Sequence, residues 1–200
     1  MNLSSYAELA VRLANTAVQA PGEPDPLGSA AACANALGDC LTGPVTRRDL
    51  VVLRHLRDEF NAIFIAAAGG ASQEAMDRMN ALLVQFPIQP ELVSHDDQRW
   101  HVHLAPHGSV SDQLAAGAVI GVALTVSLLG VSRLGVCAIA SCPGVFIDAS
   151  PGKSRRYCAE HAAAKGNVST LRRQQESSQP KSTAPNSAAS LPPRSTPAAS

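Results

Sequence analysis

The stretch that most limits the fold of this chain is an uncharged run past its middle. Residues 113–132, QLAAGAVIGVALTVSLLGVS, are 20 consecutive residues without a charge, which is long enough to cross a bilayer. Gly117-x-x-x-Gly121 is also the close-packing spacing of membrane helices. Large aliphatic residues are few, however, and no belt of Trp or Tyr flanks the run. We therefore expect a helix buried inside a soluble bundle, with a single-span membrane protein as the less favoured alternative.

Apolar spacing elsewhere predicts a mainly α protein with one small β-hairpin, an α+β class. Apolar residues make up 46% of the chain and aromatic residues only 4%, so the core should consist of Ala, Leu and Val, which favours helices. Capping patterns and helical periodicity predict helices from Ser5 with Glu8 to about Gln19, over 29–41, from Thr46 with Asp49 to Gly69, from Ser72 onward, and over 110–129.

An alternating pattern after Pro90 predicts the hairpin, with residues 91–94 pairing with 98–105. Side chains of a strand alternate between its faces. Trp100, Val102 and Leu104 are expected on the inner face, and His101 and His103 on the solvent face. A metal site at the two histidines is the less favoured interpretation.

Charge divides the chain into an acidic and a basic part. Residues 1–132 carry 7 basic and 13 acidic side chains, a net charge of −6, and residues 133–200 carry 9 and 3, a net charge of +6. The basic part could bind a polyanion or simply be solvated. The N-terminus does not look like a signal peptide, which predicts a cytoplasmic protein whose clustered cysteines bind metal rather than form disulfides. Cys33 and Cys40, which stand apart, are expected to be small core residues.

A cluster of potential metal ligands lies in the basic part. Cys137-x4-Cys142 is followed, after 15 residues, by Cys158-x2-His161. Two short-spaced pairs of thiolate and imidazole ligands suit a structural zinc ion, which would supply much of the folding energy of so small a unit. Between the pairs, residues 145–147 should form a short strand with Phe146 as its apolar anchor.

Basic residues surround the second pair, in and beside a predicted helix that follows Cys158. Candidate phosphate contacts are Arg155, Arg156, Lys165, Arg172 and Arg173, and Asn167 is the side chain placed to read a base edge. From residue 177 onward, 19 of 24 residues are Ser, Thr, Pro or Ala. That composition predicts a disordered tail, 176–200.

The segment LGVCAIASCPGVFIDASPGKSRRYCAEHAAAKGNVSTLRR resembles the CGNR zinc finger. LAVRLANTA, LRHLRDEFNAIF, MNALL and WHVHL are similar to the helical domain usually fused to that finger, the ABATE-like domain of stress-induced transcription regulators. The resemblance covers about residues 5–175. It implies a bacterial stress-response regulator, not an enzyme, with a helical regulatory domain over 1–132 and a DNA-binding zinc finger over 133–175.

The chain departs from the finger at the signature itself. Aligned on Arg155-Arg156-Tyr157-Cys158, the four CGNR positions fall on residues 162–165, so Ala162 stands where the family has its fourth cysteine. His161, three residues after Cys158, is the candidate replacement. A degenerate finger is the alternative, either metal-free or with three cysteines and a water, in an interaction protein that does not bind DNA. A homodimer and a small-molecule signal for the N-terminal domain stay open.

Overall fold

The computed structural model describes residues 3–18, 22–94, 100–105 and 107–164. Residues 1–163 form one compact unit and residues 164–200 a second, of which only Ala164 is described. The elements are α1 (Leu3–Asn15), α2 (Ala30–Leu37), η1 (Gly38–Cys40), α3 (Arg47–Ala68), α4 (Ser72–Gln85), β1 (Glu91–Val93), β2 (His101–His103), α5 (Val110–Leu129), η2 (Val131–Arg133), β3 (Leu134–Val136) and β4 (Val145–Ile147).

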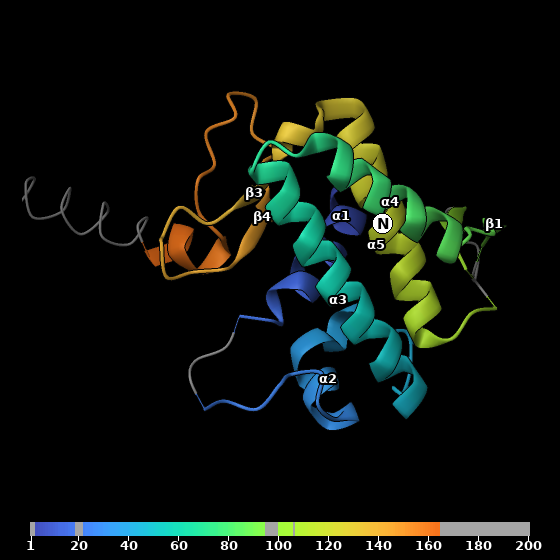
Figure 1. The fold of residues 1–200 in the computed structure, drawn as a ribbon. Coiled ribbons are helices and arrows are strands. Elements are labelled where there is room, and N and C mark those ends of the chain that lie inside the picture. The colour runs from blue at the N-terminus through green and yellow to red at the C-terminus, as the bar shows by residue number, and fades with distance from the viewer. Residues whose placement is uncertain (1–2, 19–21, 95–99, 106, 165–200) are drawn as a thin grey trace, which may run out of the picture. The chain divides into compact units, whose positions relative to one another are not determined.

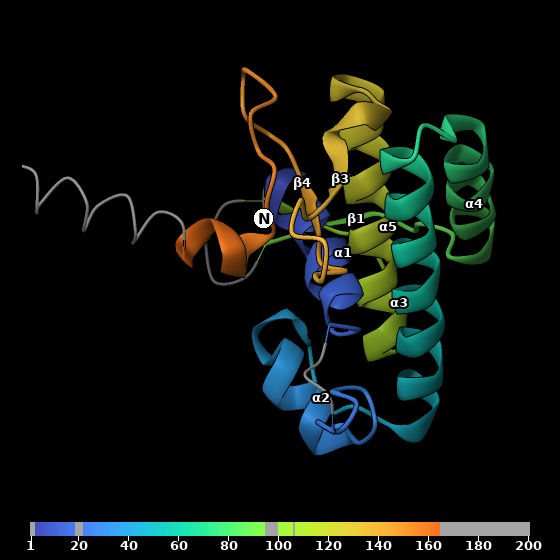
Figure 2. The same cartoon turned by 60° about the vertical axis from the view of Figure 1, so that its left-hand side comes forward.

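The fold is mainly helical with two small hairpins, which confirms the predicted class. We call residues 3–129 the helical body and residues 133–164 the metal module. Helix α1 packs on α3 and α5, and α4 packs on the other side of α3 (Figures 1 and 2). Strand β3 contacts α3 and strand β4 contacts α1. The two helices α1 and α3 therefore connect the body to the module.

The predicted starts of α2, α3 and α5 are confirmed, whereas the capping roles predicted for Ser5 and Ser72 are wrong. Thr46 and Asp49 form a reciprocal capping box at α3, and Ser29 caps α2. Ser5 lies inside α1, which already includes Leu3, and Ser72 is the first residue of α4 rather than its cap. Short polar side chains favour both caps and first turns, so the pattern alone does not distinguish the two places.

Helix α1 ends at Asn15, earlier than predicted, because polar side chains compete for its last turn. The Thr16 hydroxyl donates to the carbonyl of Leu13 at 2.7 Å, and the Asn15 side chain bonds to β4. Such side-chain bonds to backbone groups offer the chain an alternative to continuing the helix.

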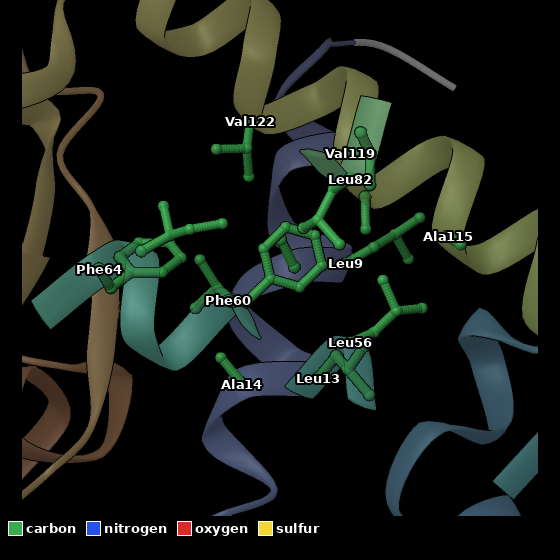
Figure 3. Packing of buried hydrophobic residues seen from close by; sticks show 14 of the residues in the cluster. Leu9, Leu13, Ala14, Leu56, Phe60, Phe64, Leu82, Ala115, Val119 and Val122 are labelled. Atoms are coloured by element: carbon green, nitrogen blue, oxygen red, sulfur yellow. The ribbon is translucent and has the colours of Figure 1, made fainter. Parts of the chain in front are cut away.

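Large side chains from three helices fill the core of the body. Phe60 and Phe64 of α3 lie between α1 and α5, and Figure 3 shows them among Leu13, Val119 and Val122. All five are fully buried. Burying a side chain of this size contributes roughly 1.5–3 kcal/mol. Met79 and Leu82 of α4 are also buried.

Two glycines of α5 let it approach α1 closely. A side chain at Gly121 would overlap the backbone of Tyr6 and Ala7, and a Cβ at Gly117 would lie 2.8 Å from Leu9. By length and composition α5 could cross a membrane, and 50% of its most apolar window is buried. The packing on α1 accounts for the Gly-x-x-x-Gly spacing without a lipid surface.

The predicted hairpin exists, but the prediction of its inner face is wrong. Leu92 pairs with Val102 in an antiparallel ladder. Leu92, Val102 and the neighbouring Trp100 are nevertheless exposed, Trp100 to 72%, while His103 and Leu104 are half-buried. Alternation separates the two faces of a strand, but it does not say which face meets the core.

Strands β3 and β4 pair antiparallel and belong to the core of the body. Leu134, Val145 and Ile147 join the same buried cluster as the helices. Gly135 faces the ring of Phe146, where a Cβ would lie 2.5 Å from the nearest ring carbon. The strand over residues 145–147 was predicted and is confirmed, whereas its partner β3 was not predicted.

Candidate metal centre

Three separate segments bring four potential metal ligands together beside β4. Cys137 follows β3 directly, and Cys142 lies in the turn that leads into β4. Cys158 immediately precedes a short helical segment, residues 159–164, which contains His161. The amide of Ala162 donates to the carbonyl of Cys158 at 2.9 Å, so Cys158 and His161 lie within one helical turn.

The spacing of the four ligand atoms fits a tetrahedral metal ion. One ligand atom from each of Cys137, Cys142, Cys158 and His161 lies within 4.8 Å of all the others. The Sγ atoms of Cys142 and Cys158 are 3.9 Å apart. Nδ1 of His161 is 3.5 Å from Sγ of Cys137 and 3.2 Å from Sγ of Cys158. Zinc–sulfur bonds of about 2.3 Å place two sulfurs of a tetrahedral site roughly 3.8 Å apart.

The centre is closed on its cysteine side. Cys137, Cys142 and Cys158 are at most 8% exposed, and Ile139 and Tyr157 pack against them. His161 is half-buried and forms the outer edge. Four protein ligands would fill every coordination position of a tetrahedral zinc ion, which is typical of a structural zinc site rather than a catalytic one.

The thiols affect one another strongly, which favours binding of a cation. Burial works against ionisation of Cys137, but hydrogen bonds from the backbone of Ile139 and Cys158 lower the pKa of its thiol to about 7. Burial, together with the neighbouring thiols, raises the pKa of Cys142 to about 11, against a hydrogen bond from Gly144. Three thiolates this close repel one another unless a metal ion lies between them.

Gly144 fits where a larger residue would crowd the centre. Its amide donates to Sγ of Cys142 at 3.3 Å. A Cβ at this position would lie 3.1 Å from Sγ of Cys142 and 3.1 Å from Cβ of Cys158. Contacts that tight require a neighbour to move, so glycine lets the two cysteines approach each other.

Two family models match the chain, one after the other. Residues 133–175 match the CGNR zinc finger. Residues 7–129, more than half of the chain, match ABATE, described as "Putative stress-induced transcription regulator". The chain belongs to the ABATE family. No curated protein matches it. The description names a transcription regulator and not an enzyme, and the finger with its Cys3His cluster suits zinc.

Within the CGNR finger, Arg155 bonds to the finger itself. Its guanidinium lies 5.3 Å from the centre of the Phe146 ring. It also donates to the carbonyls of Ile147 and Tyr157, both at 3.2 Å. Arg155 was predicted to contact phosphate. These bonds join β4 to the segment that carries Cys158, and the phosphate contact of Arg155 stays a prediction.

Arg156, the next residue, is exposed. Its backbone carbonyl accepts from the amide of Ala138 at 2.8 Å, which anchors it to the first cysteine loop. The other residues predicted to contact DNA lie outside the described residues: Lys165, Asn167, Arg172 and Arg173. The same holds for the predicted tail, and for the predicted helix beyond residue 164.

The loop that follows β4 extends away from the helices in Figure 1. The buried side chain of Asp148 organises this loop. Its carboxylate accepts from the amide of Ser150 at 2.9 Å and from the amide of Arg155 at 3.0 Å. Burial opposes its ionisation, but the bonds from Ser150 and Arg155 prevail and lower its pKa. Sequence analysis missed this residue, although Asp-x-Ser before Pro-Gly is typical of a side-chain-closed turn.

Asn15 joins the ABATE domain to the finger by a two-way bond. Its Nδ2 donates to the carbonyl of Val145 at 3.0 Å, and its Oδ1 accepts from the amide of Val145 at 2.8 Å. The side chain therefore pairs with β4 as a neighbouring strand would. No local pattern could have predicted this contact, because the two residues are 130 positions apart.

Proposed function

We propose that this protein is a bacterial, cytoplasmic transcription regulator that binds DNA through its zinc finger. Cys137, Cys142, Cys158 and His161 hold the zinc ion, and His161 replaces the thiol that Ala162 lacks. The compact cluster of these four side chains is the observation that supports the proposal most directly. An imidazole three residues after Cys158 lies on nearly the same side of a helical turn as a cysteine four residues after it.

The division of labour follows the two family matches. Residues 1–132 receive the signal or mediate homodimerisation, residues 133–175 bind DNA, and residues 176–200 form the tail. The finger depends on the body for its position, because Asn15 and the buried side chains of β3 and β4 attach it to α1 and α3.

Arg156 is the described residue best placed to contact a phosphate. It is exposed, and it follows an arginine whose bonds within the finger hold the backbone at this point. We assign Lys165, Arg172 and Arg173 to further phosphate contacts and Asn167 to a base edge. Arg155 then acts by positioning Arg156. Phosphate contacts of this kind supply most of the affinity of non-specific DNA binding.

Metal content tests the ligand set. The unaltered protein should hold about one zinc ion per chain, as a structural site does. His161→Ala should lower that content, and Ala162→Cys in the same chain should restore it. Ala163→Cys is the matched control and should not restore zinc, because it projects from another side of the helical turn. Full zinc content in His161→Ala would exclude histidine as a required ligand.

Salt-dependent DNA binding tests the function. Each lost phosphate contact should reduce the slope of log affinity against log salt by about 0.9. Arg156→Ala should show that reduction while keeping its zinc. Arg48→Ala, which removes an exposed arginine from α3, is the matched control and should bind DNA as the unaltered protein does. A zinc-loaded protein with no affinity for DNA at low salt would favour an interaction protein with a purely structural finger.

A further inference from the structure

A cavity of about 320 Å³ lies where α1, α2 and the zinc finger meet. Its wall includes Val11 and Thr16 from α1 and the turn after it, and Ala36 from α2. Gly144 and Cys158 line it from the finger side. A volume near 300 Å³ is at the lower end for small-molecule sites, and such sites are mostly apolar with a few polar groups at defined points.

The charges around the cavity favour a cation. Glu8 of α1 and Glu160 of the finger both line it and are both exposed. Arg12, the one basic side chain among the described lining residues, donates to Asp39 and to the carbonyl of Ala36. Its charge is therefore already compensated. A zinc ion with three thiolates behind the Cys158 wall carries a net charge of about −1.

We propose that this cavity binds a small organic cation: an amine with an apolar body. The apolar body would lie against Val11 and Ala36, and the ammonium group would lie between Glu8 and Glu160. The proposal does not depend on DNA binding. An organic anion would meet two carboxylates, and among the described lining residues no uncompensated positive charge would balance it, which disfavours binding.

The cavity also connects its ligand to the zinc finger. The amide of Gly144 donates to Sγ of the candidate ligand Cys142, and Cys158 is itself a candidate ligand. A molecule that bridges α1 and the segment around Glu160 therefore restrains the segment that carries Cys158 and His161. A ligand that binds better when this segment is in place than when it has moved away stabilises the segment in place, by as much as the two affinities differ.

The test measures binding of phenethylammonium to the full-length, zinc-loaded protein by nuclear magnetic resonance. The neutral isostere phenethyl alcohol and the anion hydrocinnamate serve as probes of charge. We expect the amine to shift the amide signals of Val11, Ala36 and Glu160, with a dissociation constant on the order of 1 mM for so small a probe. The alcohol should bind several-fold more weakly, and hydrocinnamate should not bind.

Two variants locate the site. Ala36→Leu places a larger side chain in the cavity and should weaken amine binding by about tenfold or more. Ala34→Leu, an exposed position on the same helix, is its matched control. Glu8→Gln with Glu160→Gln should remove the preference for the amine over the alcohol. Asp77→Asn with Glu91→Gln, the same loss of charge elsewhere, should leave that preference intact.

Zinc release to a chelator provides a second readout. Saturating amine should slow the release several-fold in the unaltered protein and not in Ala36→Leu. Equal binding of amine and hydrocinnamate would overturn the proposed ligand class. Unweakened binding to Ala36→Leu would overturn the location, and an unchanged rate of zinc release would overturn the connection to the finger. None of these outcomes depends on whether the protein binds DNA.

Discussion

The helical body and the metal module differ in what fills their interiors. In the body, fully buried side chains of α3 such as Leu53, Phe60 and Phe64 form the centre of the core, where α3 packs on α1 and α5. In the module, the buried group around the metal site is three thiols with two partly buried neighbours. The apolar side chains of β3 and β4 belong to the core of the body instead. The strands of the module are therefore stabilised by apolar burial against the body, and its cysteine loops are stabilised by the zinc ion.

Removal of zinc should separate the two regions most clearly. Metal binding contributes on the order of 10 kcal/mol to the folding of small zinc domains. With a chelator, hydrogen exchange should lose protection in the cysteine loops and around residues 158–161, while the amides of α3 stay protected. Added zinc should restore the protection. Equal loss of protection in α3 would contradict a body that is stable without the metal.

The reverse experiment removes a large side chain from the body. Phe60→Ala should lower the free energy of unfolding by about 3–5 kcal/mol because it leaves a cavity in a fully buried site. Denaturant titration measures that loss. The zinc content of the folded protein should not change, and a variant that lost its zinc while still folded would show that the body shapes the metal site directly.

Asn15→Ala tests the connection between the two regions. It leaves the amide and carbonyl of Val145 without their side-chain partner, and the expected loss is roughly 2 kcal/mol. Hydrogen exchange should show the loss first in β4. Asn80→Ala, an exposed asparagine on α4, is the matched control and should stay within about 0.5 kcal/mol.

Acid should weaken the body through Asp49, a buried carboxylate at the start of α3. Burial alone would raise its pKa, but hydrogen bonds from Thr46 and Ser111 lower it strongly. An unfolded aspartate has a pKa near 3.9, so the stabilisation is present in full above that pH and is lost as pH falls toward the folded value.

In the Asp49→Asn variant, the free energy of unfolding should fall by about 1–2 kcal/mol at neutral pH. The difference from the unaltered protein should shrink on acidification below about pH 4. Asp77→Asn, at an exposed position of α4, is the control. A constant difference across that pH range would mean that the charge of Asp49 does not contribute.

The smallest effect is expected at the hairpin, where sequence and structure disagree. Trp100→Ser should change the free energy of unfolding by less than about 0.5 kcal/mol, because the side chain is 72% exposed. A loss of several kcal/mol would support the prediction from alternation that Trp100 lies on a buried inner face. Leu82→Ser, at a buried position of α4, is the contrasting variant and should be strongly destabilising.

Local patterns were sufficient where the physics is local. The capping box at Thr46 and Asp49 involves residues three apart, and the cysteine spacings describe short loops that end near one another. They were insufficient where a distant surface decides the outcome. The bond from Asn15 to Val145 could not be predicted, because its partner lies far along the chain. The exposure of Trp100 could not be predicted either, because it depends on whether a distant segment covers the hairpin, and none of the described residues does.

The sequence by itself determined the helical class, the metal-binding residue types and the family. Helical periodicity, thiol and imidazole chemistry and signature spacing are all properties of short segments. Only the tertiary structure decided that Arg155 binds within the finger, that β3 and β4 complete the core of the body, and that a cavity lies against the zinc site. These outcomes depend on which surfaces meet when the chain folds. Contacts between residues far apart in the sequence leave no local pattern in it.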